Sequence, residues 1–150
     1  MMDRIEEVSL AIDFIEANLT ERLNLDRIAD AVHYSKYHLH RVFSDTVGLT
    51  VHEYMKRRQL TESAKLLVFS EKPIVDIALL SGYRSQQAFT SAFTAMYKMP
   101  PNMYRENERF YPLQLRLILK GVMRCWTEQK VPGGKLHLPP RQKFRAGWSW

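Results

Sequence analysis

The feature that most constrains this chain is an internal repeat with a period of about 50 residues. Ile28-Ala29 and Ile77-Ala78 lie 49 positions apart, as do Tyr34 and Tyr83. Beyond that point the offset is 50, in matched caps, aromatics and helix starts: Ser35 with Ser85, Phe43 with Phe93, Thr50 with Pro100, and Tyr54 with Tyr104. One extra residue in the second copy, at or next to Arg84, explains the change of offset. Each copy has the pattern of a short helix, a tight turn and a longer capped helix.

Apolar periodicity predicts seven helices and no strand before residue 110. The first helix follows apolar residues at steps of three and four from Ile5 to Leu19. The other six begin at capping residues or at proline: Asn24, Ser35, Thr50, Pro73, Ser85 and Pro100. The predicted fold class is therefore all-α. A first helix-turn-helix unit covers residues 1–49, a long linker helix covers 50–69, and a second unit covers 70–109.

The helix-turn-helix plan predicts binding to double-stranded DNA, because the second helix of each unit enters the major groove. A helix over 51–69 spans about 27 Å, which approaches the ~34 Å between successive major-groove faces. Two different units in one chain predict a monomer on an asymmetric site. The alternative is a seven-helix bundle whose repeat arises from packing. The ordered match of turn, cap and aromatic residues favours DNA binding over that alternative.

The charge of the chain is unevenly distributed. Residues 1–109 contain 14 Lys and Arg against 15 Asp and Glu, whereas residues 110–150 contain 8 against 1. The formal net charge of +6 is therefore weak evidence for nucleic-acid binding by the helical part. No apolar run approaches the length that a membrane span needs, so no membrane partner is expected. The single cysteine, Cys125, and the scattered histidines predict no metal site and no cofactor, and a cytoplasmic location is expected.

A longer set of residues carries a resemblance to a known family. Ile77-Ala78, Gly82-Tyr83, Ser85 to Phe89, Phe93, and Pro100 to Arg105 resemble the signature of the AraC/XylS transcription regulators. The stretch from Tyr34 to Phe43 is most similar to the MarA/SoxS/Rob subgroup. The resemblance covers residues 5 to about 107. It implies a monomer on DNA, recruitment of RNA polymerase as an activator, and no enzymatic activity.

The resemblance also implies which residues contact DNA. Base recognition falls to seven residues: Tyr37, His40, Arg41, Gln86, Gln87, Thr90 and Ser91. Arg41 is favoured because a guanidinium can bond O6 and N7 of guanine together. Tyr37 has the alternative of packing across the turn, and His40 that of being merely exposed. Phosphate contacts fall to four residues: Lys36, Arg57, Arg84 and Ser85. For Arg57 and its neighbour Arg58, a structural or salt-bridge role is the alternative.

Three positions depart from the family pattern. Ser91 stands where the resembled proteins carry arginine, and Ala88 replaces a hydroxyl residue, so no cation lies between Ser85 and Tyr97. The second unit is therefore expected to contribute less base discrimination and more backbone contact than the first. His33 stands where family members often have glycine, and if its φ is positive, histidine tolerates that conformation better than most residues, at some cost.

Residues 110–150 form a basic tail. Alternation of apolar and polar residues over 112–120 predicts a strand there. Three interpretations stay open: the truncated start of a C-terminal effector domain, a hairpin packed on the helices, or a disordered arm. No N-terminal ligand-sensing domain is expected ahead of the first helix. Two alternative functions follow, a protein-interaction module with little selective DNA binding and a ligand-responsive regulator that lacks most of its effector domain.

Overall fold

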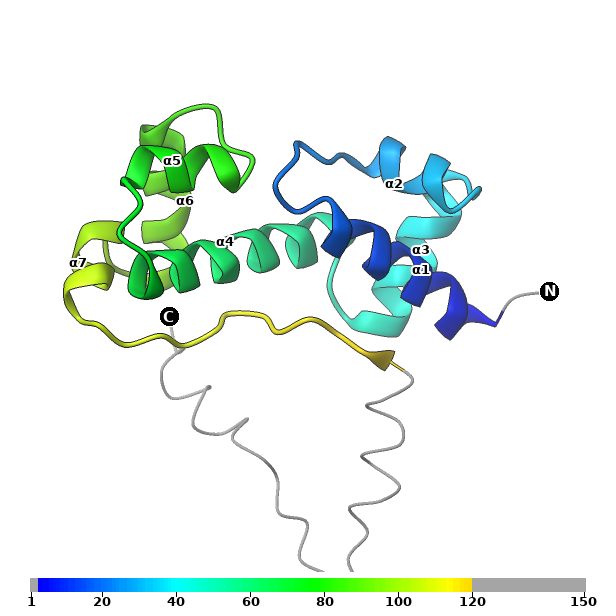
Figure 1. Cartoon of the computed structure of the whole chain (residues 1–150). Coiled ribbons are helices and arrows are strands. Elements are labelled where there is room, and N and C mark those ends of the chain that lie inside the picture. The colour runs from blue at the N-terminus through cyan, green and yellow to red at the C-terminus, as the bar shows by residue number, and fades with distance from the viewer. Residues whose placement is uncertain (1–2, 120–150) are drawn as a thin grey trace, which may run out of the picture. The chain divides into compact units, whose positions relative to one another are not determined.

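A computed structural model describes residues 3–119, in which seven helices and no strand are formed (Figure 1). The helices are α1 (Arg4–Ala17), α2 (Leu25–Ala31), α3 (Lys36–Val47), α4 (Val51–Phe69), α5 (Ile74–Leu80), α6 (Gln86–Tyr97) and α7 (Pro101–Glu106). The all-α prediction is thus confirmed for the described part of the chain. Within the described range, residues 3–116 belong to one compact unit.

The first helix-turn-helix unit packs its amphipathic helices around a small apolar core. The side chains that α1 buries are Val8, Ala11, Ile12 and Ile15, one face of a 3.6-residue period. A capping box between Asp3 and Glu6 closes the N-terminus of α1, with the Asp3 amide donating to the Glu6 carboxylate at 3.3 Å. The buried residues of α3 are Leu39, Val42 and Phe43. This packing holds the outer face of α3 away from the core.

Helix α4 joins the two units, as Figure 1 shows. Thr50 Oγ1 accepts from the Glu53 amide at 3.1 Å, and the Glu53 carboxylate accepts from the Thr50 amide at 3.0 Å, so the predicted capping box starts the helix. Its apolar residues are buried against both units, from Val51 and Tyr54 at one end to Ala64 and Leu67 at the other. One helix therefore contributes to both cores.

The repeat seen in the sequence is present in three dimensions. Ser35 and Ser85 cap α3 and α6, and each hydroxyl accepts from the amide three residues on, at 3.2 and 3.1 Å. The turn before each cap contains one residue with positive φ, His33 at 60° and Gly82 at 80°. His33 thus adopts a positive φ, which histidine tolerates better than most residues. The two helix-turn-helix units are therefore built on the same plan.

Alternation predicted a strand over residues 112–120, and none of the described residues 112–119 lies in a strand. The amides of Leu113 and Gln114 both donate to Thr61 Oγ1 of α4, at 3.0 and 2.9 Å, and Leu113 is buried. Arg116 pairs with Asp13 of α1 at 2.6 Å. Leu113 is the one residue of 112–119 that is buried, while Leu115 is 63% exposed, so the alternation does not mark one buried face in this part of the chain. The three interpretations of the tail concern residues that lie mainly outside the described range.

Candidate nucleic-acid interface

The exposed face of α3 brings together three of the predicted base-contacting residues. Tyr37, His40 and Arg41 follow the spacing of one helix face, and all three are exposed. The ring of Tyr37 is 90% exposed, so it does not pack across the turn. No carboxylate within 4.0 Å pairs with Arg41 among residues 3–119. An exposed tyrosine ring beside an unpaired guanidinium can contact a thymine methyl and a guanine edge.

A histidine that sequence reasoning left out holds this face in position. His38 Nε2 lies 3.0 Å from Glu7 Oε2 of α1, and its ring lies 4.9 Å from that of Tyr34. The pKa of Tyr34 is raised by desolvation and by the nearby Glu7 carboxylate. His38 therefore ties α3 to α1 on the inner side, while Tyr37 faces outward. The sequence offered one sign of this role, because His38 follows Tyr37 directly and therefore lies about 100° around the helix from the exposed face.

The exposed face of α6 is polar and carries no charge. Gln86, Gln87 and Ser91 are exposed, and Thr90 is half-buried. The inward side holds an aromatic cluster in which Phe93 stacks on Tyr97 with ring centroids 4.5 Å apart. Amide and hydroxyl groups can bond base edges or phosphates, but they lack the long-range attraction of a cation. The exposed faces of α3 and α6 thus differ in charge, because α3 carries Arg41 and no Lys, Arg, Asp or Glu lies in α6.

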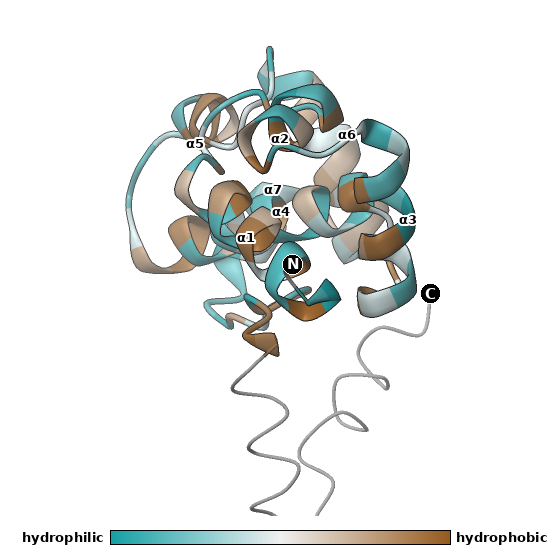
Figure 2. Cartoon of the chain, turned by 90° about the vertical axis from the view of Figure 1, so that its right-hand side faces the viewer, coloured by the Kyte–Doolittle hydropathy of each residue, from teal (hydrophilic) through white to brown (hydrophobic). Residues whose placement is uncertain are grey.

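Helices α3 and α6 lie on the same side of the helical part of the chain. Figure 1 separates α3 from α6 along α4, and Figure 2, a quarter turn away, places both on one side, with hydrophilic ribbon at their outer turns. The turn between α5 and α6 closely approaches the loop between α1 and α2 at Gly82, beside Gln59 of α4, whose Nε2 donates to Leu19 O of that loop at 3.1 Å. A Cβ added at Gly82 would lie 3.1 Å from Gln59 Nε2 and 3.1 Å from Glu21 O. The spacing of the two helices therefore depends on this contact as well as on α4.

The predicted phosphate-contacting residues have different surroundings. Lys36 Nζ lies 2.6 Å from Asp26 Oδ1, and this carboxylate raises the pKa of Lys36. Both side chains are more than half exposed, so the pair can exchange for a phosphate at little cost. Arg84 is exposed on the turn before α6, and the Ser85 hydroxyl is engaged as the N-cap. Arg57 is half-buried and has no carboxylate within 4.0 Å among the described residues.

Arg58, which the sequence left undecided, is a structural residue. It is 5% exposed, and its Nε and Nη2 donate to the two oxygens of Glu16 at 2.6 and 2.8 Å. Nη2 also donates to Glu62 at 3.0 Å, and Nη1 donates to Gln114 O at 2.9 Å. Burial alone would lower the pKa of Arg58, but the two carboxylates raise it above its ordinary value. This arginine joins α1, α4 and the segment after α7, and it is not available to DNA.

Sites of other chemistry are not evident in residues 3–119. Within that range no three His, Cys, Asp or Glu side chains are grouped in a way that could hold a metal ion. No described helix combines the length and the apolar character that crossing a membrane requires.

Known proteins resemble this chain in sequence. Residues 28–107 match the model of a family described as a helix-turn-helix domain. The transcriptional regulator YbfP of Bacillus subtilis is 36% identical over 121 residues, 80% of this chain and 41% of that protein. The transcriptional activator AarP of Providencia stuartii is 41% identical over 104 residues, 69% of this chain and 77% of that protein. The transcriptional regulator Rob of Salmonella typhimurium is 35% identical over 115 residues, 77% of this chain and 40% of that protein.

The alignments thus span about two fifths of the length of YbfP and of Rob. Among solved structures, an AraC-type DNA-binding regulator from Chromobacterium violaceum superposes with a TM-score of 0.65 at 29% identity. That match covers 69% of this chain and 92% of the other. Three observations point to the same family. They are the two capped helix-turn-helix units on one linker helix, the family match over residues 28–107, and the relation to AarP. The chain belongs to the AraC/XylS family of helix-turn-helix transcription regulators, a family of DNA-binding proteins that are not enzymes.

Proposed function

We propose that this chain is a sequence-specific transcription activator that inserts α3 and α6 into two adjacent major-groove segments of an asymmetric site. The observation that carries the proposal is the outer face of α3, where Tyr37 is 90% exposed and Arg41 has no carboxylate partner among the described residues. A large exposed aromatic beside a free guanidinium has no stabilising role in the fold. Contact with base edges accounts for both.

The two helices have unequal roles in this proposal. Arg41 supplies most of the base discrimination, with Tyr37 and His40 beside it. Gln86, Gln87, Thr90 and Ser91 on α6 add weaker base contacts and set the register. Lys36, Arg57, Arg84 and Ser85 contact phosphates and position the protein without reading sequence. RNA polymerase is the proposed protein partner, and the protein acts as a monomer in the cytoplasm.

Selection of bound duplexes from a random pool, followed by footprinting, tests the proposal. The expected result is one asymmetric site of about 20 base pairs, which corresponds to two turns of DNA. Arg41→Ala is expected to weaken binding by about 1–3 kcal/mol and to relax the preference at one base position. Arg109→Ala, at an exposed arginine beyond α7, is the matched control and should preserve the preference. If Arg41→Ala selects the same site with the same affinity as the wild type, α3 is not the main recognition helix.

Two other functions have a specific observation behind them. The uncharged face of α6 suits a protein-interaction module with little selective DNA binding, and a selection that enriches no motif would favour it. The relatives YbfP and Rob extend well beyond the aligned region. A ligand-responsive regulator is therefore the third candidate function. A small molecule that changes DNA affinity would favour this third function.

A further inference from the structure

A groove of about 410 Å³ lies between the two helix-turn-helix units, and none of the DNA-contacting roles inferred from the family uses it as a whole. Its floor is one face of α4, formed by His52, Met55, Lys56 and Gln59 at helical spacings of three and four. One wall is the loop after α1, at Arg22 and Leu23. The other wall is the turn before α6, with Arg84, and the α6 side chains beyond it.

The lining of this groove is cationic. Arg22, Lys56 and Arg84 come from three separate segments, and no carboxylate lines the groove. None of the three has a carboxylate within 4.0 Å in the described part of the chain. Three cations gathered without counter-charges repel one another, so their arrangement is poorly explained by stability of the fold. It suits an anionic ligand that binds between them.

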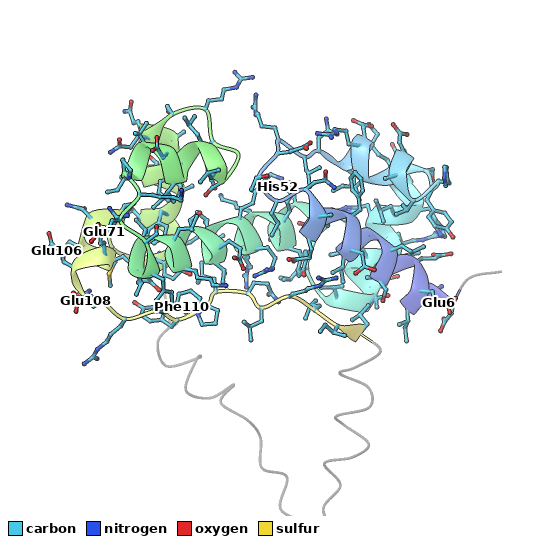
Figure 3. The ribbon with its side chains drawn as sticks, in the orientation of Figure 1. Glu6, His52, Glu71, Glu106, Glu108 and Phe110 are labelled. Atoms are coloured by element: carbon cyan, nitrogen blue, oxygen red, sulfur yellow. The ribbon has the colours of Figure 1, made fainter. Side chains whose placement is uncertain are left out.

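The two acidic residues next to groove residues in the sequence are engaged elsewhere: the carboxylate of Glu53, beside His52, accepts from the Thr50 amide at 3.0 Å. The carboxylate of Glu21, next to Arg22, pairs with Arg27 at 2.9 Å. In Figure 3, the groove residue His52 lies near the middle of the helical part of the chain. The labelled glutamates lie toward its two ends, with Glu6 at the start of α1 and the others near α7: Glu71, Glu106 and Glu108. The helical part has almost no net charge, with 14 Lys and Arg against 15 Asp and Glu in residues 1–109. The groove is therefore a local concentration of positive charge on a nearly neutral body.

The position of the groove identifies the anion. When two recognition helices occupy successive major-groove segments on one face of B-DNA, the minor groove and its two phosphate strands lie between them. The α6 residue Ala88, next to the predicted contact Gln87, lines the groove, so the groove borders the recognition face of α6. Tyr83 also lines it, and burial raises the pKa of Tyr83 to about 12, which keeps its hydroxyl neutral. No acidic group of the lining would oppose a phosphate.

We propose that Arg22, Lys56 and Arg84 bind the phosphodiester backbone of the DNA segment that lies between the two recognition helices. This inference rests on the proposed function, which already assigns Arg84 to a phosphate, and it adds Arg22 and Lys56 to Arg84 as one joint contact. The contact is independent of base sequence. It supplies at the centre of the site the positive charge that α6 lacks.

The dependence of DNA affinity on salt measures this contact. Each lost phosphate contact lowers the slope of log K against log salt by about 0.9. In the full chain carrying Arg22→Gln and Arg84→Gln together, the magnitude of this slope should therefore be smaller than in the wild type by about 1.8. Between 50 and 200 mM salt its affinity should fall about 12-fold less than that of the wild type. The selected base sequence should not change, because phosphates carry no base identity.

Matched variants separate this groove from general charge. Lys65 is an exposed lysine on α4 that does not line the groove, so Lys65→Gln is the control for Lys56→Gln. Arg109→Gln is the control for the two arginines. The controls should keep the wild-type slope. If they lower it as much as the groove variants do, the effect is one of net charge and the proposal is wrong.

Neutral methylphosphonates placed at the central phosphates of the selected site locate the contact. They should weaken binding of the wild type, and they should have little effect on the Arg22→Gln and Arg84→Gln double variant. Equal weakening of both proteins overturns the groove proposal. A wild-type chain that selects no motif overturns the proposed function instead, and the salt slopes on a random duplex still test the groove. Equal slopes of wild type and double variant there also overturn it.

Discussion

Replacement of Gly82 by alanine should cost more than the same change at Gly48, although both glycines have nearly the same backbone conformation. Their φ values are 80° and 82°, in the left-handed region that disfavours a Cβ. At Gly48 nothing lies within 4 Å of an added Cβ. Gly48→Ala therefore measures backbone strain alone, which we expect to be about 1 kcal/mol once the lower entropy of the unfolded alanine chain is included.

At Gly82 the added methyl group meets atoms of the first unit. It would lie 3.1 Å from Gln59 Nε2 and 3.1 Å from Glu21 O, closer than ordinary van der Waals contact. Gln59 can move only by losing its hydrogen bond to Leu19 O, at a cost of about 1 kcal/mol. The Glu21 backbone is held by its own amide, which donates to Asn18 O at 3.0 Å. The total for Gly82→Ala should therefore be about 2–3 kcal/mol.

Urea unfolding followed by far-ultraviolet circular dichroism measures both variants, with unchanged m-values as the check that unfolding stays comparable. DNA footprints give a second readout. Gly82→Ala should weaken protection of the segment contacted by α6, because the turn before α6 moves relative to the first unit, and Gly48→Ala should not. If the unfolding free energies of Gly82→Ala and Gly48→Ala differ by less than about 0.5 kcal/mol, the close approach of Gln59 and Glu21 is not what requires glycine at position 82.

Two further predictions follow from single side chains. Arg58→Ala should destabilise the fold by about 3–5 kcal/mol, because it leaves the Glu16 carboxylate buried without its partner, whereas Arg57→Ala should leave thermal unfolding nearly unchanged and weaken DNA binding. Equal loss of stability in the two variants would contradict this. Glu53 has a lowered pKa because the Thr50 amide and hydroxyl form hydrogen bonds to its carboxylate. Its contribution to the free energy of unfolding is therefore fully present above its unfolded pKa and is lost as pH falls through the lowered value. Acid titration of unfolding should show less loss of stability below pH ~4.5 in Glu53→Gln than in wild type, and identical profiles would contradict this.

Local sequence determined the helices and their ends. Ser35 and Thr50 start their helices with hydrogen bonds to residues three positions away, and such contacts depend only on the neighbouring chain. The apolar periodicity of α1 and α4 likewise selects which face is buried. For this reason the seven helices and the repeat could be predicted without a structure.

Contacts between distant residues decided the rest. Arg57 and Arg58 are neighbours in sequence, but one step turns the side chain by about 100°, and only Arg58 meets Glu16, 42 residues earlier. The strand expected over residues 112–120 is absent from the described residues. The amides of Leu113 and Gln114 donate instead to Thr61, a contact that alternation in the sequence cannot predict. The groove that we propose as a phosphate contact joins Arg22 and Arg84 from opposite units. Helical pattern reports which face of a helix is buried, while the packing of the two units along α4 decides which polar side chains meet.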